Sequence, residues 1–484
     1  MGSTYKGNDR ALIGFILGLL GFWLFAQTML NINVEMGKQL SISSSVLNLA
    51  VAAAALFSGL FVVVAGNLAD RFGRVRILRW GYLFGVVGGG LVACTMPGRL
   101  AVPLLIAGRI FQGLSIACIM PSSLALVKVY WSGAARQRAV SLWSMGTWGG
   151  AGFSSLLGGF LLASIGWRAI FGLAVLGCVL GYFLTRDIPE SKEEHRGGQG
   201  MDWLGLVIFI VTIFSLQLVA TQGSSWGWTS WLTIMLLALA VVGVVWFVFA
   251  EKRATRPFVD INLFRNGTYL GATLSNFILN AVAGILIVSL NLMQMAAGAS
   301  AATAGCLTIG YAVAIVLLIR MGERLLRRFG PRRPMVWGCL IVCVSIVLLM
   351  NTHVMSDTYM VLAAIAYTLF GVGLAFYATP STDAALGNLP LAQAGAGAGI
   401  YKMASSLGAA FGVAISSTIY TSLNMRVSPS SMLDEVITFV GRQDNVVLRD
   451  SAFWALLFNL VCVLLAVVVI FLTVPKGKKV EVKS

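Results

Sequence analysis

Residues 66–76 read Gly66-Asn67-Leu68-Ala69-Asp70-Arg71-Phe72-Gly73-Arg74-Val75-Arg76 and lie between two long apolar runs. The stretch places a carboxylate at the end of one run, then a glycine turn, then basic residues at the start of the next run. A second stretch, Leu325-Leu326-Arg327-Arg328-Phe329-Gly330-Pro331, repeats the Arg-Phe-Gly 257 residues later, again between apolar runs. The matched turns indicate an internal repeat, and the runs around them determine the class of fold.

The composition excludes a soluble protein. The 484 residues are 58% hydrophobic and 11% charged, with a mean hydropathy of +0.88, whereas a soluble domain carries about 25% charged residues. A soluble enzyme, a disordered chain and a secreted disulfide scaffold are therefore excluded. Lipid accepts helices or closed barrels, and a barrel needs short alternating strands. The continuous apolar runs instead predict an all-α polytopic membrane protein.

Fourteen segments are long and apolar enough to cross a bilayer, which takes about 20 residues. The seven cysteines lie inside these segments without metal-ligand spacing, so we expect apolar packing roles for them and no metal site. The predicted spans are 11–33, 44–66, 77–97, 101–127, 139–163, 167–185, 203–222, 230–250, 268–296, 301–321, 334–352, 358–380, 394–422 and 451–474.

Further matches extend the repeat over six segments in each half. We interpret the last six spans as a parallel copy of the first six, with two spans inserted between them, a 6 + 2 + 6 arrangement. The predicted division is an N-terminal bundle at 1–190, a linker with two inserted helices at 191–260 and a C-terminal bundle at 261–484. The matched residues, 258 or 259 positions apart, are Gly113 with Gly371, Pro121 with Pro380, and Gly150 with Gly408.

The net charge of +16 arises mainly from one side of the predicted spans. With the N-terminus inside, 26 of the 34 Lys and Arg residues fall on the inner side and 6 on the outer side, while Arg109 and Lys402 fall within spans. Because positive residues mark the cytoplasmic loops of membrane proteins, we expect both termini in the cytoplasm. The basic residues are dispersed between spans, so we expect no nucleic-acid partner.

The stretch at 66–76 closely resembles the loop 2–3 signature of the major facilitator superfamily, in which two parallel six-helix repeats rock about a central site. The resemblance implies that Asp70 faces the N-terminus of the thirteenth span, whose partial positive charge attracts an anion, and holds a cytoplasmic gate shut. The alternative is a solvated loop charge pair without a gating role. The implied gating residues are Gly66, Asp70, Arg71, Gly73 and Arg74.

The fourth span carries Arg109-Ile110-Phe111-Gln112-Gly113, which resembles the helix 4 signature of drug/proton antiporters. A cation within the membrane is a functional candidate by default. The alternative is a structural arginine bonded to neighbouring carbonyl groups.

The fifth span resembles the glycine-rich helix 5 signature of the same antiporters through Gly146, Gly150, Gly158 and Gly159. Ser154-Ser155 replaces the usual Gly-Pro. Small residues still allow close helix approach, but the proline kink is absent.

Over nearly its whole length the sequence resembles fourteen-span drug/proton antiporters of the DHA2 type, and within them the Nor-type quinolone-resistance exporters of staphylococci. The stretches 22–27, 377–383 and 399–405 carry the closer match. One departure is Phe25-Ala26-Gln27-Thr28, where many relatives have an aspartate in the first span.

The resemblance implies a monomeric, proton-coupled multidrug exporter in the bacterial cytoplasmic membrane. Its cargo would be amphipathic drugs such as fluoroquinolones, dyes and quaternary ammonium compounds, moved by alternating access with the proton gradient as energy source and no cofactor. A lipid or metabolite transporter is the alternative, since the fold does not choose the cargo. An enzyme is not expected, because the two histidines, His195 and His353, fall on opposite sides of the membrane.

Proton coupling requires a group that is protonated on one side of the membrane and deprotonated on the other. Glu35, at the outer end of the first span, and Asp383, just after the twelfth, are the acidic candidates, unless they are interfacial charges in contact with water. Arg109 and Lys402 are the basic candidates. Lys402 either snorkels towards the cytoplasm or forms an ion pair with Asp383 that breaks during transport.

Aromatic and amide side chains in spans expected to face the centre could bind flat cationic drugs through stacking, cation–π contact and hydrogen bonds. The alternative is that they pack between helices or face lipid. The candidates are Phe22, Trp23, Phe25, Gln27, Gln112, Trp143, Trp148, Asn280, Asn291, Gln294, Phe376, Tyr377 and Tyr401.

Overall fold

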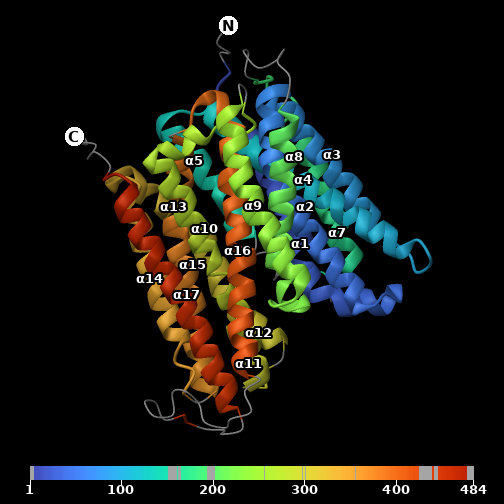
Figure 1. The fold of residues 1–484 in the computed structure, drawn as a ribbon, viewed down its shortest axis with the longest axis vertical. Coiled ribbons are helices and arrows are strands. Elements are labelled where there is room, and N and C mark those ends of the chain that lie inside the picture. The colour runs from blue at the N-terminus through green and yellow to red at the C-terminus, as the bar shows by residue number, and fades with distance from the viewer. Residues whose placement is uncertain are drawn as a thin grey trace. The chain divides into compact units, whose positions relative to one another are not determined.

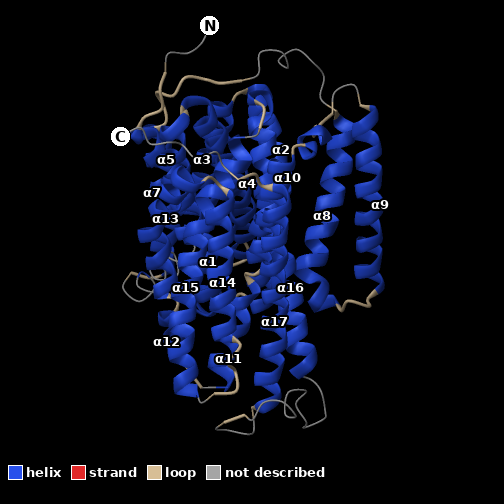
Figure 2. Cartoon of the chain, turned by 90° about the vertical axis from the view of Figure 1, so that its left-hand side faces the viewer, coloured by secondary structure: helices blue, strands red, loops and turns tan. Residues whose placement is uncertain are grey.

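The computed structural model of the chain describes residues 5–476 except 151–160, 162–164, 193–201, 255–256, 297, 300, 355, 388, 425–438 and 441–444, and in the first helix it does not describe the side chains of residues 25–31 and 33–34. Four predicted site residues, Phe25, Gln27, Gly158 and Gly159, therefore lie outside the described part. The residues that are described form helices and no strand (Figure 2).

The chain divides into two compact units. The first contains Met1–Gln222, Trp226–Leu270 and Thr382–Met403. Its helices are α1 (Asp9–Leu40), α2 (Ser44–Phe72), α3 (Arg74–Ala93), α4 (Ala101–Tyr130), α5 (Gly133–Ser144), the π-helix η1 (Met145–Gly149), α7 (Trp167–Leu184), α8 (Trp203–Trp226), α9 (Trp231–Arg253) and the 3₁₀ turns η2 (Ile261–Arg265) and η3 (Leu391–Gln393) (Figure 1).

The second unit contains Gly223–Ser225, Gly271–Ser381 and Ala404–Ser484. The boundary therefore passes through two helices, so that the end of α15 and the beginning of α16 pack with the first unit. The helices concerned are α10 (Gly267–Ala281), α11 (Gly284–Ala296), α12 (Ala301–Leu307), α13 (Ile309–Phe329), α14 (Arg332–Leu349), α15 (Ser356–Gly387), α16 (Ala394–Asn424) and α17 (Val446–Thr473). The three-part division expected from the sequence stays a prediction.

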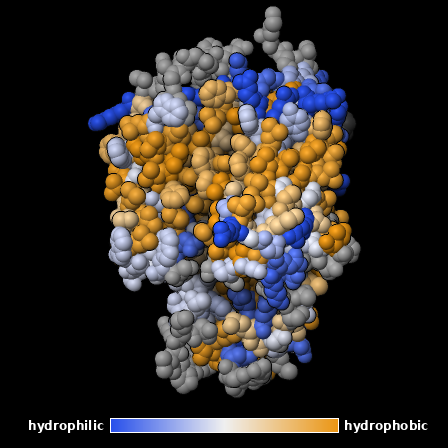
Figure 3. Space-filling model, turned by 90° about the vertical axis from the view of Figure 1, so that its right-hand side faces the viewer, coloured by the Kyte–Doolittle hydropathy of each residue, from blue (hydrophilic) through white to orange (hydrophobic). Residues whose placement is uncertain are grey.

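Twelve helices in the described part of the chain are long and apolar enough to cross a membrane, against fourteen predicted. They coincide with every predicted span except the first and the fifth. The first corresponds to α1, a helix of 32 residues, and the fifth begins in α5 and η1 and runs into residues 151–160, outside the described part. Hydrophobic side chains cover much of the face drawn in Figure 3, as expected of a surface in contact with lipid.

The sequence repeat has a counterpart in helix packing. Each unit contains helix pairs that approach so closely that a Cβ added to one glycine would lie within 3.0 Å of a carbonyl oxygen of its partner helix. Such contacts need glycine, because any side chain would push the helices apart. The contacts in the first unit are Gly113 with Ala54 and Gly81 with Ser115, and those in the second are Gly371 with Tyr311 and Gly338 with Gly373, each residue 257 or 258 positions from its counterpart.

Three predicted spans are not continuous α-helices. The span at 268–296 breaks between α10 and α11, where the Ala283 N–H donates to the Asn280 carbonyl across the four-residue turn 280–283. At this break α16 comes very close to α10: a Cβ on Gly412 of α16 would lie 1.7 Å from the carbonyl oxygen of Ala281. The span at 301–321 breaks at Thr308, between α12 and α13, and that at 139–163 contains the π-helix η1. Such local departures are not encoded in hydropathy.

The inserted helices α8 and α9 lie side by side (Figures 1 and 2). They pack closely, since a Cβ on Gly243 of α9 would lie 2.2 Å from the Thr212 hydroxyl of α8. The most apolar window of α9 is only 22% buried, and its exposed side chains, such as Val242 and Trp246, are hydrophobic. Within the first unit α9 therefore has an exposed apolar face, as expected of a surface in contact with lipid.

Candidate functional site

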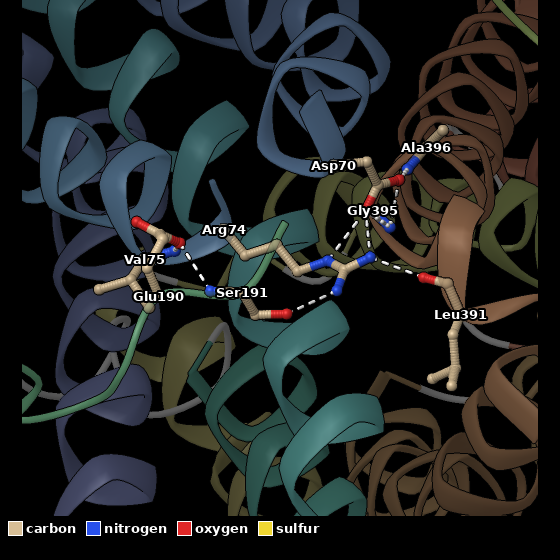
Figure 4. Close-up of polar contacts among 8 residues, drawn as sticks. All are labelled: Asp70, Arg74, Val75, Glu190, Ser191, Leu391, Gly395 and Ala396. Atoms are coloured by element: carbon tan, nitrogen blue, oxygen red, sulfur yellow. Dashed lines mark hydrogen bonds and ion pairs between the residues drawn. The ribbon is translucent and has the colours of Figure 1, made fainter. Parts of the chain in front are cut away.

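The turn between α2 and α3 is built around Gly73. Its φ of 122° lies in the region that favours glycine, and a Cβ there would lie 2.5 Å from the Glu190 carboxyl carbon. The Glu190 carboxylate accepts a hydrogen bond from the N–H group of Val75 at 2.9 Å (Figure 4) and another from the N–H group of Arg76, also at 2.9 Å. It thus satisfies two of the free donors at the start of α3, and the turn is held in a single geometry.

Asp70 lies at the N-terminus of α16. Its side chain is completely buried, and its two carboxylate oxygens accept hydrogen bonds from the N–H groups of Gly395 at 2.9–3.0 Å and of Ala396 at 2.9 Å (Figure 4). These donors are the second and third residues of α16, where the helix leaves N–H groups free and carries a partial positive charge. The carboxylate therefore caps a helix 325 residues away in sequence.

Arg74 completes this cluster from the first turn of α3. Its guanidinium donates to Asp70 Oδ1 from Nε at 2.9 Å and from Nη2 at 2.7 Å, to Ser191 Oγ at 2.8 Å and to the Leu391 carbonyl at 2.6 Å. Arg74 is only 3% exposed. A buried charge of this kind is tolerated when it is paired and its donors are satisfied, which is the case here.

Two glycines allow the chain segments of this cluster to meet. A Cβ on Gly66 of α2 would lie 2.2 Å from the Gly395 carbonyl oxygen, and one on Gly395 would lie 2.4 Å from the Gly66 oxygen. The two helices therefore touch backbone to backbone one turn above Asp70. Arg71, the remaining residue of the predicted gating motif, is also buried.

Lys128 holds the neighbouring helix end. From the last turn of α4, its Nζ donates to the carbonyl oxygens of Leu386 and Leu389, which lie at the C-terminal end of α15 and just beyond it. Cations are favourable at the C-terminus of a helix, so Lys128 and Asp70 bind opposite helix ends on either side of the α15–α16 connection. Lys128 was not among the predicted site residues. The available signal was a basic residue at the end of a span that contains glycine and serine.

Asp383 lies in the last turns of α15, whereas the sequence placed it after the helix. Its Oδ1 accepts a hydrogen bond from Nε of Arg136 at 3.2 Å. Arg136 lies in the first turn of α5, three residues before the start of the predicted span at 139–163. Lys402 instead lies over the ring of Trp143, with Nζ 4.5 Å from the centroid. The proposed Lys402–Asp383 pair is therefore replaced by two separate contacts, because α5 supplies both the arginine and the tryptophan.

Arg109 is 1% exposed in the middle of α4. Its Nε donates to the Ala50 carbonyl of α2 at 3.2 Å, and its Nη1 donates to Gln112 Oε1, one turn later, at 2.8 Å. Glu35 is half-buried and accepts a bond from Gln39 at 2.7 Å.

The other pocket candidates are distributed over both units. Those in the first unit are Phe22, Trp23, Gln112, Trp143, Trp148 and Tyr401, and those in the second are Asn280, Asn291, Gln294, Phe376 and Tyr377. Tyr377 is buried, and its hydroxyl shares a hydrogen bond with that of Ser275 at 2.8 Å. The Tyr377 side chain therefore links α15 to α10. Asn291 and Gln294 are exposed on α11.

The two helix 5 glycines in the described part of the chain face α1. A Cβ on Gly150 would lie 2.6 Å from the Trp23 ring, and one on Gly146 would lie 3.4 Å from Leu19. Among the described residues, no group of three or more His, Cys, Asp or Glu side chains could hold a metal ion.

Comparison with known proteins identifies the family. The Major Facilitator Superfamily matches the chain at residues 11–413 and 268–483. Quinolone resistance protein NorB of Staphylococcus aureus is 42% identical in strain MRSA252 and 41% identical in strain COL, over 98% of this chain and 97% of those proteins.

Solved structures share the fold at low sequence identity. The proton:xylose symporter XylE is 16% identical with a TM-score of 0.66, over 99% of this chain and 98% of that one. The human organic anion transporter MFSD10 is 13% identical with a TM-score of 0.65, over 95% and 98%. With its apolar helices and its full-length relatives, the chain belongs to the major facilitator superfamily and is a multi-pass membrane transporter, not an enzyme.

Proposed function

We propose that the chain is a proton-coupled multidrug exporter of the fourteen-span DHA2 type, with both termini in the cytoplasm of a bacterium. The observation that carries this proposal is the 42% identity to a quinolone resistance protein over 98% of the chain. The cargo is then fluoroquinolones and other amphipathic drugs, including dyes and quaternary ammonium compounds. The protein works as a monomer, without a cofactor, on the energy of the proton gradient.

The contacts at the start of α16 act as the cytoplasmic gate. Asp70 binds the N-terminus of α16, and Lys128 binds the end of α15, so the connection between these helices is held at both ends. Both contacts involve buried or partly buried charges, which are costly to expose singly. Opening this side of the transporter requires both to break, which gives the alternating-access cycle a discrete closed state.

Proton coupling is assigned to the ionisable groups beside this gate. Asp383 and Lys402 are both buried and both contact α5. Asp383 is bonded by Arg136 and Gln137, and the Lys402 ammonium lies over the rings of Trp143 and Tyr401. Protonation of Asp383 removes its attraction to Arg136 and frees the end of α15. Drug binding that favours the opened state then favours the same protonation change, which is the reciprocity that coupling requires.

Reconstituted transport tests the proposal. The purified protein is placed in liposomes with an imposed pH gradient, and movement of norfloxacin or ethidium is followed with and without a protonophore. We expect drug movement against its gradient that the protonophore abolishes. Matched liposomes without protein are the control for leak.

Two results would contradict the proposal. Drug movement that is insensitive to the protonophore would exclude proton coupling. Movement of a fluorescent lipid, with none of several amphipathic drugs, would assign the chain to a lipid carrier of the same fold.

A further inference from the structure

The inserted helices contain a buried acid that the transport site described above does not use. Glu251 lies in the last turn of α9 and is only 3% exposed. Its Oε2 accepts a long bond from the Val259 N–H at 3.3 Å. An ionised carboxylate needs several donors when it is buried. The donors to this one are two backbone N–H groups, that of Val259 at 3.3 Å and that of Phe258, and Oε1 has no partner among the described residues.

A second carboxylate faces it. Asp202 caps the start of α8 by accepting the Gly205 N–H at 2.8 Å with Oδ1. A Cβ added to Gly205 would lie 2.6 Å from Asp202 Oδ2 and equally far from Glu251 Oε1, so these oxygens are separated by no more than twice that distance. Two carboxylates so close, one of them buried and the other half-buried, repel each other when both are ionised. Glu251 is the more buried of the two.

The other charged groups around Glu251 come from the same end of the helices. Asp260 follows α9 and adds a further negative charge on this side. The exposed bases Lys252 and Arg253 follow Glu251 on its own helix, and Lys252 and Arg265 line a groove that also reaches Glu251 and Asp260. The groove gives a proton from Glu251 a route to water.

The backbone that Glu251 contacts is attached to the gate. Residues 257–260, here called the strap, run from the end of α9 towards η2. The Phe258 carbonyl accepts a bond from Asn67 of α2 at 2.7 Å, one turn before Asp70. Asp260 Oδ2 accepts a bond from Gln393 at 3.0 Å, and Gln393 ends the turn that precedes α16. The strap therefore contacts α2 and the turn η3 that precedes α16, and Glu251 binds its centre.

We propose that Glu251 is a proton-binding site of the inserted helices, and that its proton holds the strap on the closed gate. Neutral Glu251 accepts the Val259 N–H without repelling Asp202 or Asp260. When the proton leaves through the groove, the carboxylate is repelled by both acids and draws water, and the strap separates from Asn67 and Gln393. The inserted helices thereby make gate opening depend on pH. This inference rests on the gating role proposed above.

Hydrogen–deuterium exchange of the purified full-length protein, without any drug, tests the inference. The peptides of interest cover 257–262 and 391–396, and rates are corrected for the intrinsic effect of pH. In the wild type we expect protection of both peptides to fall about tenfold as the pH is raised from about 5 to about 9. In Glu251→Gln, a neutral side chain of the same shape, protection stays high over this range.

A second variant and a control complete the design. Asp202→Asn keeps the helix cap but removes the facing charge, so the midpoint of the transition moves to lower pH by about one unit. Asp187→Asn, which removes an exposed acid of the first unit, leaves the transition unchanged. A wild type without a transition, a Glu251→Gln variant that keeps it, or an unmoved midpoint in Asp202→Asn would each overturn the inference. No substrate is present, so failure of the drug-export proposal gives a separate result.

Discussion

The charged residues buried near the start of α16 each have a specific partner. Asp70 pairs with Arg74 and two helix N–H groups, and Asp383 pairs with Arg136. Removing one partner of a buried pair is much more costly than removing both, because it leaves a charge without compensation. This asymmetry makes the contacts testable one residue at a time.

Asp70→Asn should reduce transport at least tenfold. The NH₂ group of the asparagine would point at another donor, either the Gly395 N–H or the Arg74 guanidinium. The substitution also removes the negative charge to which both donors are attracted. Breaking a buried ion pair costs about 3 kcal/mol, and only the closed state would lose this stabilisation.

Uptake of ethidium into everted membrane vesicles measures the effect of Asp70→Asn. Asp187→Asn breaks an exposed pair with Arg10 and should leave uptake unchanged; uptake by Asp70→Asn within twofold of the wild type would contradict a gating role.

The Arg136–Asp383 contact should appear in a double-mutant cycle. Arg136→Gln and Asp383→Asn each lower transport, but the double variant should be no worse than the poorer single one, because each single change already breaks the pair. The losses of Lys402→Met and Asp383→Asn should instead multiply, since the Lys402 ammonium lies over Trp143. Initial rates in everted vesicles give both cycles. Multiplying losses for Arg136 and Asp383 would show that the pair does not matter for transport.

At the scale of helices, hydropathy and glycine spacing predicted most elements but not their interruptions. The spans at 203–222 and 230–250 correspond closely to α8 and α9. The break at 282–283 and the π-helix at 145–149 were missed, because both depend on contacts with other helices and leave the apolar pattern unchanged.

The same limit applies to the site. The glycines and Asp70 carry a recognisable local pattern, whereas Arg136 finds Asp383 across 247 residues, a partnership that no local spacing encodes. Glu190, which caps α3 from beyond α7, was missed for the same reason. The available signal was an acid directly after Pro189, at the end of a span.

Glycine-to-alanine changes should separate helix crossings from ordinary helix interiors. Gly66→Ala places a methyl group 2.2 Å from the Gly395 carbonyl oxygen, so α2 and α16 must move apart and the closed state is destabilised. Gly90→Ala in α3 meets nothing within 4 Å and should stabilise its helix by up to about 1 kcal/mol. Thermal unfolding in detergent and vesicle uptake measure both. Equal behaviour of the two variants would remove the argument that these glycines permit close contact.

For the whole molecule, the orientation of the second half depends on the number of inserted helices. The Arg-Phe-Gly turns at 71–73 and 328–330 are parallel copies, so they belong on the same side of the membrane. An odd insertion would move the basic residues around Arg328 to the outer side, against the charge rule. The helices α8 and α9, of 24 and 23 residues, are each about 35 Å long and can cross the bilayer. An inserted pair of spanning helices keeps both halves in this orientation, and so would a pair that lies on the membrane without crossing it.

Reporter fusions check this arrangement. Alkaline phosphatase is active only outside the cytoplasm, so a fusion after Gly227, in the turn between α8 and α9, should be active. Fusions after Ala254, beyond α9, and after Lys476, beyond α17, should be inactive, while green fluorescent protein at the last site should fluoresce. The fusions after Gly227 and Ala254 differ only by helix α9, so their phosphatase activities should differ sharply. Each activity is divided by the amount of fusion protein in the membrane. An inactive Gly227 fusion at normal level would mean that α8 and α9 lie on the membrane instead of crossing it, and the chain would then have twelve spans with the same orientation of both halves.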